Sequence, residues 1–480
     1  MTEMLDFFDN ILWGSILIYL LLGTGIYLSL RTRFIQFRQF GHIFSSKLLK
    51  TSSDARGIST FQALCISLAA RLGTGNLAGV ALALTAGGPG AIFWMWAIAL
   101  IGMVTSLFEN TLAQLYKSHD ASGRFRGGPA DYMTRGLGMR WMGVFFSILL
   151  VLSFGLVFNA LQANAIAQAT AVAFDTDGHF VAVVLLVLTA ATIFGGLKTF
   201  SRIAQRAIPL MVLAWLILAV WVMAHNIERL PQVFVLIFKS AFGWQEAASG
   251  AVGYGVMQAL TQGMQRGLFS NEAGMGSSPN AAALAAPTPS HPAAVGFSQM
   301  LGVFIDTLVI CTSTALIILS SGLLDAPGQR LEGIALLQGA ISAATGGLGH
   351  LLVAAFVFVF AFSSIASNYI YAENNLIFLH SGERAKLFVF RLLVLAMVAF
   401  GCLAELPLMW KMADIAMALM TITNLTALLL LSDVAMKVIK DYERQRKMGK
   451  TPVFNPDHFP EIRRQLKPGI WQKPPSQPED

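Results

Sequence analysis

The sequence predicts an all-α integral membrane protein that crosses the bilayer about eleven times. Of its 480 residues, 55% are hydrophobic and only 12% are charged, whereas a soluble protein carries about 25% charged residues. The mean hydropathy is +0.63. So few charges cannot cover the surface of a folded chain of this length, so the composition excludes a soluble enzyme, a disordered chain and a disulfide scaffold.

Long apolar runs place the spans, because a helix needs about 20 apolar residues to cross a bilayer. Continuous runs of this kind argue against a β-barrel, whose strands are short segments of alternating hydropathy. The acidic opening MTEMLDFFDN differs from the basic start of a cleavable signal peptide. We expect helices near residues 11–30, 60–86, 89–116, 141–172, 180–197, 207–225, 250–266, 294–320, 350–379, 387–404 and 410–433.

The distribution of Lys and Arg orients this map. With the N-terminus outside, the cytoplasmic segments hold 28 of the 33 Lys and Arg residues, the outer segments hold 4, and Arg71 lies within a span. Positively charged loops resist translocation, so we expect an outside N-terminus and a cytoplasmic C-terminus in the cell (inner) membrane. The net charge of +7 is therefore a topology signal and does not indicate nucleic-acid binding.

The predicted spans divide the chain into four parts. Residues 1–58 form an extra N-terminal helix and a basic loop, 59–225 and 226–435 form two five-helix units, and 436–480 form a basic, Pro-rich cytoplasmic tail. The end of this tail, residues 451–480, contains seven of the chain's 17 prolines. We expect that end to be solvated and poorly ordered.

The second span contains the run Arg71-Leu72-Gly73-Thr74-Gly75-Asn76 near its middle. Glycine permits non-helical backbone angles, and backbone groups freed at this depth need partners. We therefore predict a discontinuous helix, whose freed N–H groups suit a carboxylate and whose freed C=O groups suit a cation. The alternative is a small-residue packing face formed by Gly75 and Gly79, which leaves Thr74 and Asn76 unexplained.

A second interruption is predicted five spans later, around Gly250, Gly253 and Gly255 in the span 250–266. Broken helices at corresponding positions of two halves are typical of inverted-repeat transporters. The sequence therefore predicts one extra N-terminal helix followed by a 5+5 inverted repeat with discontinuous helices. The spacing of the breaks carries this inference, since the two halves show no convincing residue-level similarity.

Four motifs carry a resemblance to a known family: LAARLGTGNLAGVA (68–81), GGPGAIFWMWAIALIG (87–102), RGLFSNEAGMGSSPNA (266–281) and FSSIASNYIYAENN (362–375). Together they resemble the alanine or glycine:cation symporters, also called the sodium:alanine symporters. The similarity extends over roughly residues 10–435. It implies a leucine-transporter-type fold of the amino acid–polyamine–organocation superfamily, and uptake of a small neutral amino acid with Na⁺.

The resemblance also implies a sodium site between the first broken helix and the ninth span. By position, its backbone carbonyl ligands are expected from Ala69, Leu72 and Phe360, and its hydroxyl ligands from Ser363 and Ser364. Oxygen ligands at the negative end of a half-helix suit a hard cation. The alternative for a serine pair in a membrane helix is a hydrogen bond to the preceding turn.

The substrate carboxylate is expected to meet backbone N–H groups at the first break, and polar side chains of the fourth and ninth spans are expected nearby. Helix–helix hydrogen bonding is the commoner role of such amides and is the alternative for each. Glycine and alanine around both breaks favour a small ligand. The candidate substrate-binding residues are Gly73, Thr74, Gly75, Asn76, Gln162, Asn164, Gly253, Gly255 and Asn368.

Ionisable residues at membrane depth are costly and usually functional. Asp306 is the candidate for proton coupling or gating, and Glu109 and Glu373 are candidates for gates or for structural pairs with loop arginines. Asp414 lies at similar depth. Arg71 either competes with a cation beside the carbonyl ligands or pairs with a carboxylate as an inner gate.

The broken helices and the family resemblance together predict a secondary active symporter, and the resemblance implies that it imports alanine or glycine with Na⁺ by alternating access. The alternative is a proton-coupled amino-acid carrier that uses Asp306 or Glu109, with H⁺ as the coupling ion. A channel is less favoured because no selectivity filter or charged ring is apparent. An enzyme is not expected, since no nucleophile–base pair or metal-ligand cluster is found. We expect the lipid bilayer to surround the protein, and we expect neither a cofactor nor an obligate protein partner.

Overall fold

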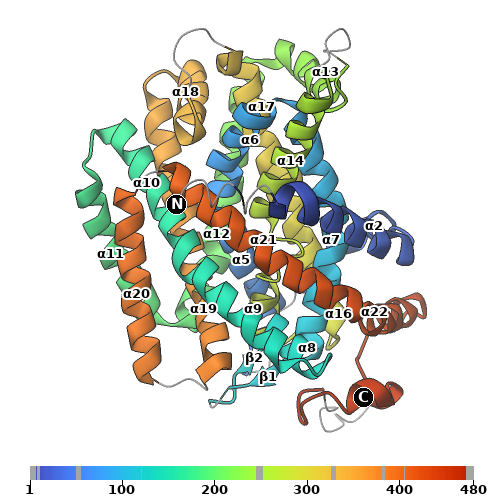
Figure 1. The fold of residues 1–480 in the computed structure, drawn as a ribbon. Helices are drawn as coiled ribbons and strands as arrows, with labels where there is room; N and C mark the ends of the chain where they lie inside the picture. The colour runs from blue at the N-terminus through green and yellow to red at the C-terminus, as the bar shows by residue number, and fades with distance from the viewer. Residues whose placement is uncertain are drawn as a thin grey trace.

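The computed structural model describes residue 7 and residues 11–49, 56–120, 122–244, 252–325, 331–380, 384–404 and 406–471. These residues are mostly helical, with one small antiparallel sheet in which β1 (Ser118–His119) pairs with β2 (Phe125–Arg126). Long helices run between an end that carries α13, α17 and α18 and an end that carries β1, β2 and α8 (Figure 1).

In the first half of the chain, the helices and the π- or 3₁₀-helical segments (η) are η1 (Leu12–Leu17), α2 (Ile18–Arg31), α3 (Ile35–Arg38), α4 (Phe40–Ile43), η2 (Ser46–Leu49), α5 (Thr60–Arg71), η3 (Gly75–Gly79), α6 (Val80–Gly87), α7 (Gly90–Leu115), α8 (Pro129–Arg135), α9 (Arg140–Leu152), η4 (Ser153–Val157), α10 (Phe158–Phe174), α11 (Gly178–Gly195), α12 (Leu197–His225), η5 (Ile227–Arg229) and α13 (Leu230–Ala241).

The second half contains α14 (Val252–Asn271), α15 (Pro279–Ala283), α16 (Pro292–Val303), η6 (Phe304–Cys311), α17 (Thr312–Ser321), η7 (Leu323–Asp325), α18 (Gly333–Thr345), α19 (Leu348–His380), α20 (Arg384–Leu403), α21 (Leu406–Leu430), α22 (Ser432–Lys447), η8 (Pro456–His458) and α23 (Pro460–Arg463).

Nine continuous helices of the described chain are long and apolar enough to cross a membrane, and the bent pair α5 and η3–α6 makes a tenth. Ten of the eleven predicted spans correspond to these helices. The remaining predicted span, 250–266, corresponds to α14, which is 20 residues long but carries polar side chains such as Gln262, Gln265 and Arg266. The all-helical membrane fold is therefore confirmed, whereas the count of eleven stays a prediction.

The break predicted in the second span is present. A capping box starts α5, with the Gln62 N–H donating to Ser59 Oγ at 3.1 Å and the Ser59 N–H donating to Gln62 Oε1 at 3.0 Å. The helix ends at Arg71, because Leu72 takes a non-helical ψ of 71°. The chain resumes as η3 and α6 after a bend of 52°.

The second predicted break is in the wrong place. Gly253 and Gly255 lie within α14, which is continuous from Val252 to Asn271, and Gly250 lies outside the described residues. The chain instead leaves the helix at residues 272–278, before α15 begins at Pro279. Gly274 and Gly276 adopt φ values of +92° and +82° there, which only glycine adopts without strain.

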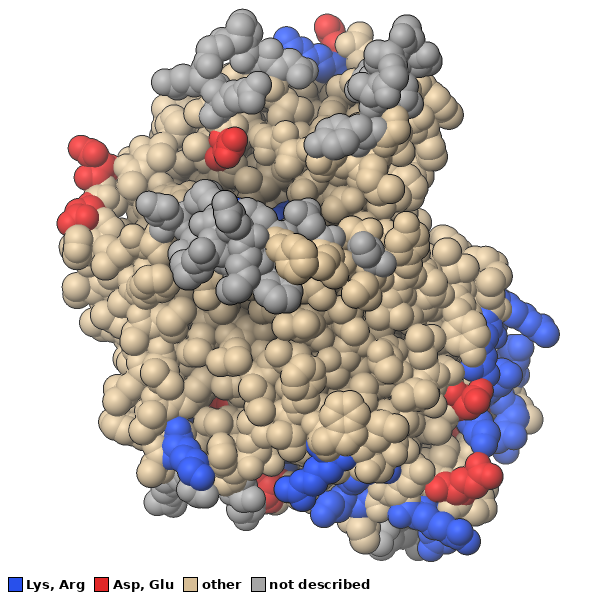
Figure 2. Space-filling model, viewed as in Figure 1, with Lys and Arg blue, Asp and Glu red and all other residues tan. Residues whose placement is uncertain are grey.

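Both interruptions lie inside the bundle. Helix α5 packs against α12, α16 and α19, and α14 packs against α6 and α7. Residues 68–80 and 264–286, which contain the two interruptions, are buried throughout. Lys and Arg gather along the lower edge and over α22, and the band across the middle of this face is nearly uncharged (Figure 2). Such a band suits the hydrocarbon core of a bilayer.

The expectation of a poorly ordered tail is wrong for residues 451–471, and residues 472–480 lie outside the described chain. The Phe454 N–H donates to the Ser290 carbonyl at 3.0 Å. The Trp471 Nε1–H donates to the Leu115 carbonyl at 3.1 Å, and the indole lies 4.8 Å from the Lys117 ammonium. Phe454 and Trp471 are only 3% and 7% exposed, so apolar burial fixes this Pro-rich segment against the bundle.

We predict that Trp471→Ala releases the tail. Removing a buried indole costs about 3 kcal/mol, which raises the open population by about 100-fold. Limited tryptic cleavage after Arg463 and Arg464, followed by mass spectrometry, measures this population. The matched control is Trp141→Ala, since Trp141 is 68% exposed. Equal cleavage rates for the two variants would contradict the docked tail.

Candidate functional site

The first break is held open by two side-chain amides. The Gly73 N–H donates to Asn76 Oδ1 at 3.2 Å, and the Thr74 N–H donates to Gln162 Oε1 at 3.0 Å. Gln162 comes from α10, so the fourth span satisfies a backbone group that the second span frees. The structure thus brings Gln162 to the N–H groups expected to meet a carboxylate.

The carbonyl side of the same break faces α19. Ser364 Oγ donates to the Ala69 carbonyl at 2.8 Å and to the Phe360 carbonyl at 3.1 Å. Ser363 Oγ donates to the Phe360 carbonyl at 2.8 Å. Ser364 therefore joins α5 to α19 through Ala69, whereas Ser363 bonds only to the preceding turn of its own helix, the alternative stated for the serine pair. Leu72 is the first residue after α5.

Space at the break is tight. A Cβ atom on Gly73 would lie 2.5 Å from Ser364 Oγ and 2.8 Å from the Gln162 amide, and a Cβ on Gly75 would lie 2.9 Å from the Phe269 ring. Only glycine allows the backbone to approach these groups so closely. The cluster of Gly73, Gly75 and their neighbours leaves room for a small ligand at most.

Several buried polar atoms beside the break have no hydrogen-bond partner within the described chain. They are Thr74 Oγ1 in the break, and Ser367 Oγ, Asn368 Oδ1 and the Tyr371 hydroxyl on α19. Ser364, Asn368 and Tyr371 share one helix face because they are four and three residues apart. Buried polar atoms are normally paired, so this face has donors and acceptors available for a polar ligand.

The second break was misplaced from the sequence, and Glu109 is its main support. The Gly274 N–H donates to Glu109 Oε1 at 3.3 Å, and Asn424 Nδ2 donates to Glu109 Oε2 at 2.9 Å and to the Gly274 carbonyl at 2.9 Å. The run Glu272-Ala-Gly-Met-Gly-Ser-Ser-Pro279, rich in turn residues, was the available signal. Glu109 therefore lies in a carboxylate–amide cluster, without a loop arginine.

Asp306 joins the two breaks. Its Oδ1 accepts from Asn76 Nδ2 at 2.6 Å, and its Oδ2 accepts from Ser270 Oγ and Thr307 Oγ1, each at 2.7 Å. Asn76 belongs to the first break, and Ser270 ends α14 just before the second. Asp306 is fully buried and forms no ion pair with any described residue. It lies in the π-helical segment η6, a type of segment common at functional sites.

Arg71 does not enter the predicted sodium site. Its guanidinium extends toward α16, where Nη1 lies 3.5 Å from the Gln299 carbonyl, and a Cβ on Gly302 would collide with it at 2.2 Å. The residue is 1% exposed, and its Nε and Nη2 have no partner in the described chain. Arg71 forms no ion pair within 4 Å among the described residues, but its charge acts on the buried carboxylates of Glu109, Glu272 and Asp306, so its role as an inner gate stays a prediction.

Four other predicted residues lie away from the break. Asn164 Nδ2 donates to the Gly401 and Ala404 carbonyls at 2.8 and 2.7 Å, which joins α10 to α20. Glu373 pairs with Arg391 at 3.4 Å, a contact between α19 and α20. Gly253 lies on an exposed turn of α14, about five turns from the second break. The structural alternative fits Asn164 and Glu373, and Gly253 and its neighbour Gly255 line neither interruption.

A buried ion pair lies beside Phe269 and was not predicted. Arg266 Nη1 and Nη2 donate to Asp414 Oδ1 and Oδ2 at 3.0 and 2.6 Å, and the guanidinium lies 4.5 Å from the Trp410 ring centre. The Trp410 ring lies 5.0 Å from Phe269, which contacts Gly75. The pair links α14 to α21, and sequence spacing offers no signal for contacts 148 residues apart.

The sequence profile of the sodium:alanine symporter family matches residues 1–456. The chain belongs to the sodium:alanine symporter family. It is 52% identical to the uncharacterised transporter YaaJ of Escherichia coli over 98% of this chain and 99% of the relative. The family resemblance drawn from the four motifs is therefore confirmed.

Two further relatives of this symporter have names that differ in substrate and ion. The probable sodium/glutamine symporter GlnT of Bacillus subtilis is 47% identical over 94% of this chain and 92% of its own length. The putative sodium/proton-dependent alanine carrier YrbD of the same organism is 38% identical over 95% of both chains. The symporter is thus a multi-pass membrane transporter and not an enzyme, as the sequence predicted.

We predict that Gly73→Ala destabilises the symporter by about 1–3 kcal/mol, because the added methyl group overpacks Ser364 and Gln162. Gly79→Ala is the matched control, since the nearest atom to a Cβ there lies at 3.6 Å. Thermal melting of both purified variants measures the difference. A Gly73→Ala variant as stable as Gly79→Ala would disprove the close approach at the break.

Proposed function

We propose that this symporter imports a small neutral amino acid, alanine or glycine, together with Na⁺. The observation that carries the proposal is the contact of the Ser364 hydroxyl with the Ala69 carbonyl, 2.8 Å apart, where half-helix α5 ends. It joins a carbonyl freed by a helix break to a hydroxyl from another helix. Such a pair of oxygens fits a monovalent hard cation.

The cation would lie between α5 and α19, with ligands from Ala69, Leu72, Phe360, Ser363 and Ser364. Two arguments support this assignment. The C-terminal end of α5 supplies negative dipole potential at its last carbonyls. Ser364 now donates to the Ala69 carbonyl of α5 and Ser363 to the Phe360 carbonyl of α19, and rotation about their C–O bonds would turn oxygen lone pairs toward an ion instead.

The amino acid would lie on the N–H side of the same break. Its carboxylate would take over the Gly73 and Thr74 N–H groups from the Asn76 and Gln162 amide oxygens. The freed amides and the unpaired Asn368 Oδ1 would then face the ammonium group. A charged acceptor forms stronger hydrogen bonds to N–H groups than a neutral amide does, which favours this exchange.

Coupling follows from the shared break. A cation on the carbonyl side and a carboxylate on the N–H side both stabilise the same arrangement of α5 and η3, so each raises the affinity for the other. An inward Na⁺ gradient then drives uptake, and the membrane potential adds about 2.3 kcal/mol per charge per 100 mV. This link needs no chemical step.

The proposed transport cycle is alternating access between two five-helix units, residues 59–225 and 226–435, in a leucine-transporter-type fold. The breaks at α5–η3 and α14–α15 support this proposal. Helix α5 is the first helix of the first unit, and α14 is the first long helix of the second unit after α13. We propose eleven spans, including α14, with the N-terminus outside and the basic C-terminus in the cytoplasm of the cell membrane. Of the 28 Lys and Arg residues assigned to the cytoplasmic side, Arg266 lies inside the bundle, and the remaining 27 against 4 outside support this orientation.

A second candidate is proton coupling through Asp306. A buried carboxylate with hydroxyl and amide donors, but without a described cationic partner, is a candidate for reversible protonation. Because Asp306 touches both breaks, its protonation would act on the same elements as the sodium ion. Glu109, whose oxygens support the second break, is the other carboxylate that this alternative could use.

We predict that Ser364→Ala raises the Na⁺ concentration for half-maximal alanine uptake by about tenfold, since loss of one oxygen contact to a charge costs about 1.5 kcal/mol. The control is Ser298→Ala, because Ser298 only bonds back to the Val295 carbonyl in its own helix. Radiolabelled uptake into proteoliposomes measures both. Unchanged Na⁺ activation in the Ser364 variant would remove this residue from the site.

A second prediction separates the two coupling ions. In proteoliposomes, a Na⁺ gradient at equal pH drives alanine uptake, and a pH gradient without Na⁺ drives none above leak. Asp306→Asn keeps Na⁺-driven uptake measurable, because the amide preserves the shape of the side chain. If a pH gradient alone drives uptake in the unmodified symporter and Asp306→Asn abolishes this uptake, the coupling ion is H⁺ and it acts through Asp306.

A further inference from the structure

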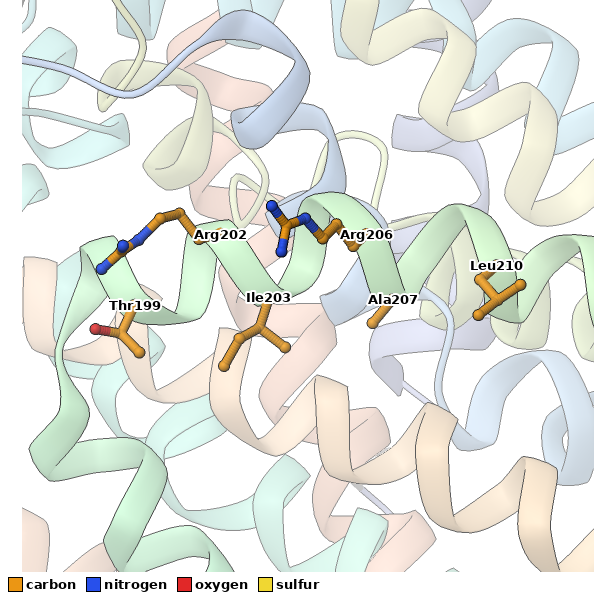
Figure 3. A pocket seen from close by; sticks show the side chains of 6 residues that line it. All are labelled: Thr199, Arg202, Ile203, Arg206, Ala207 and Leu210. Carbon is orange, nitrogen blue, oxygen red and sulfur yellow. The ribbon is translucent and has the colours of Figure 1, made fainter.

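The exposed face of α12 begins with two arginines and continues as an apolar stripe. Arg202 and Arg206 are exposed and one helical turn apart, and both project from the same side of the helix (Figure 3). They line a surface cavity of about 560 Å³ together with Thr199, Ile203, Ala207 and Leu210. Farther along α12, Leu210, Leu213 and Ile217 are 67%, 55% and 63% exposed.

Neither arginine has an acidic partner among the described residues. Arg202 Nε donates to the Lys198 carbonyl at 3.3 Å, and Arg206 makes no hydrogen bond or ion pair there. Like charges one turn apart on a helix repel each other unless an anion lies between them. A topology signal alone accounts for positive charge at this end, but not for two unpaired guanidinium groups that border an apolar cavity.

The dimensions match a phospholipid. Eleven residues separate Arg206 from Ile217, which is about 16 Å along a helix. Half of the hydrocarbon core of a bilayer is about 15 Å thick. A phosphate at the arginines would therefore place its acyl chain over Leu210, Leu213 and Ile217, down to the middle of the membrane. A free inorganic anion would leave this stripe unused.

From the two arginines without acidic partners and the exposed apolar stripe beside them, we infer that α12 carries a binding site for an anionic phospholipid. Arg202 and Arg206 bind the phosphate and the charged headgroup, and the exposed face of α12 from Ile203 to Ile217 holds one acyl chain. Guanidinium groups suit this ligand because their planar donors match phosphate oxygens. The inference does not depend on which amino acid or coupling ion the symporter transports.

The site adjoins the first broken helix. Gln205, next to Arg206, accepts from Gln62 Nε2 through its Oε1 at 3.0 Å, and Gln62 belongs to the first turn of α5. A lipid that fixes this end of α12 therefore also fixes the surface on which α5 begins. Through this contact, bound lipid stabilises the α5 arrangement that the structure shows.

Native mass spectrometry of the full-length purified protein, titrated with dioleoyl phosphatidylglycerol, tests the site. Arg202→Gln/Arg206→Gln should raise the apparent Kd of the tightest-bound lipid by about 25-fold, at about fivefold for each basic contact. Arg33→Gln/Arg140→Gln removes the same charge from two exposed arginines elsewhere and should change it less than twofold. Binding of dioleoyl phosphatidylcholine should be weaker and insensitive to either pair.

Leu210→Ser/Ile217→Ser tests the acyl-chain half of the site and should also weaken phosphatidylglycerol binding, with both arginines intact. The proposal fails if the two arginine pairs have equal effects, since the charge would then act nonspecifically. It also fails if inorganic phosphate displaces the lipid, or if the Leu210→Ser/Ile217→Ser variant binds phosphatidylglycerol normally. Either result would mean that the arginines bind an anion and that α12 has no binding site for an acyl chain. Thermal melting of each variant confirms that it is folded.

Discussion

One constraint governs the centre of this symporter: a peptide group released from a helix inside the membrane must find a new partner. Two helices are interrupted there, and the partners come from other spans. Gln162 of α10 serves the N–H side of the first interruption, Ser364 of α19 serves its carbonyl side, and Glu109 of α7 serves the second. The breaks therefore exist only in the assembled bundle.

Asp306 adds a link between the interruptions, since it accepts from Asn76 on one side and from Ser270 on the other. A ligand that alters the first break changes the position of Asn76, and thus the hydrogen bonds available to Ser270. The Asp306 carboxylate is thus one of the links between the two halves of the chain. This connection gives a structural route from ligand binding to a rearrangement of both broken helices, in the sense of a coupling free energy.

The sequence predicted the features that depend on local composition. The glycine-rich run at residues 71–76 located the first break, and hydropathy located ten spans. Long-range pairing was not predictable, because the partners of Glu109 and Arg266 lie on distant helices. The second break was misplaced because the glycines of α14 stay helical, whereas Gly274 and Gly276 leave the helix. The Pro-rich composition of the tail led to the prediction of disorder, although the buried side chains of Phe454 and Trp471 fix residues 451–471 against the bundle.

The contact between Arg266 and Asp414 has a consequence for movement. Both partners are over nine-tenths buried and joined by two parallel hydrogen bonds, so parting them takes the buried guanidinium of Arg266 away from its carboxylate. Separating such a pair costs about 3–5 kcal/mol unless water enters at the same moment. An outward swing of α14 from α21 therefore has to break both hydrogen bonds together and bring water to the buried guanidinium.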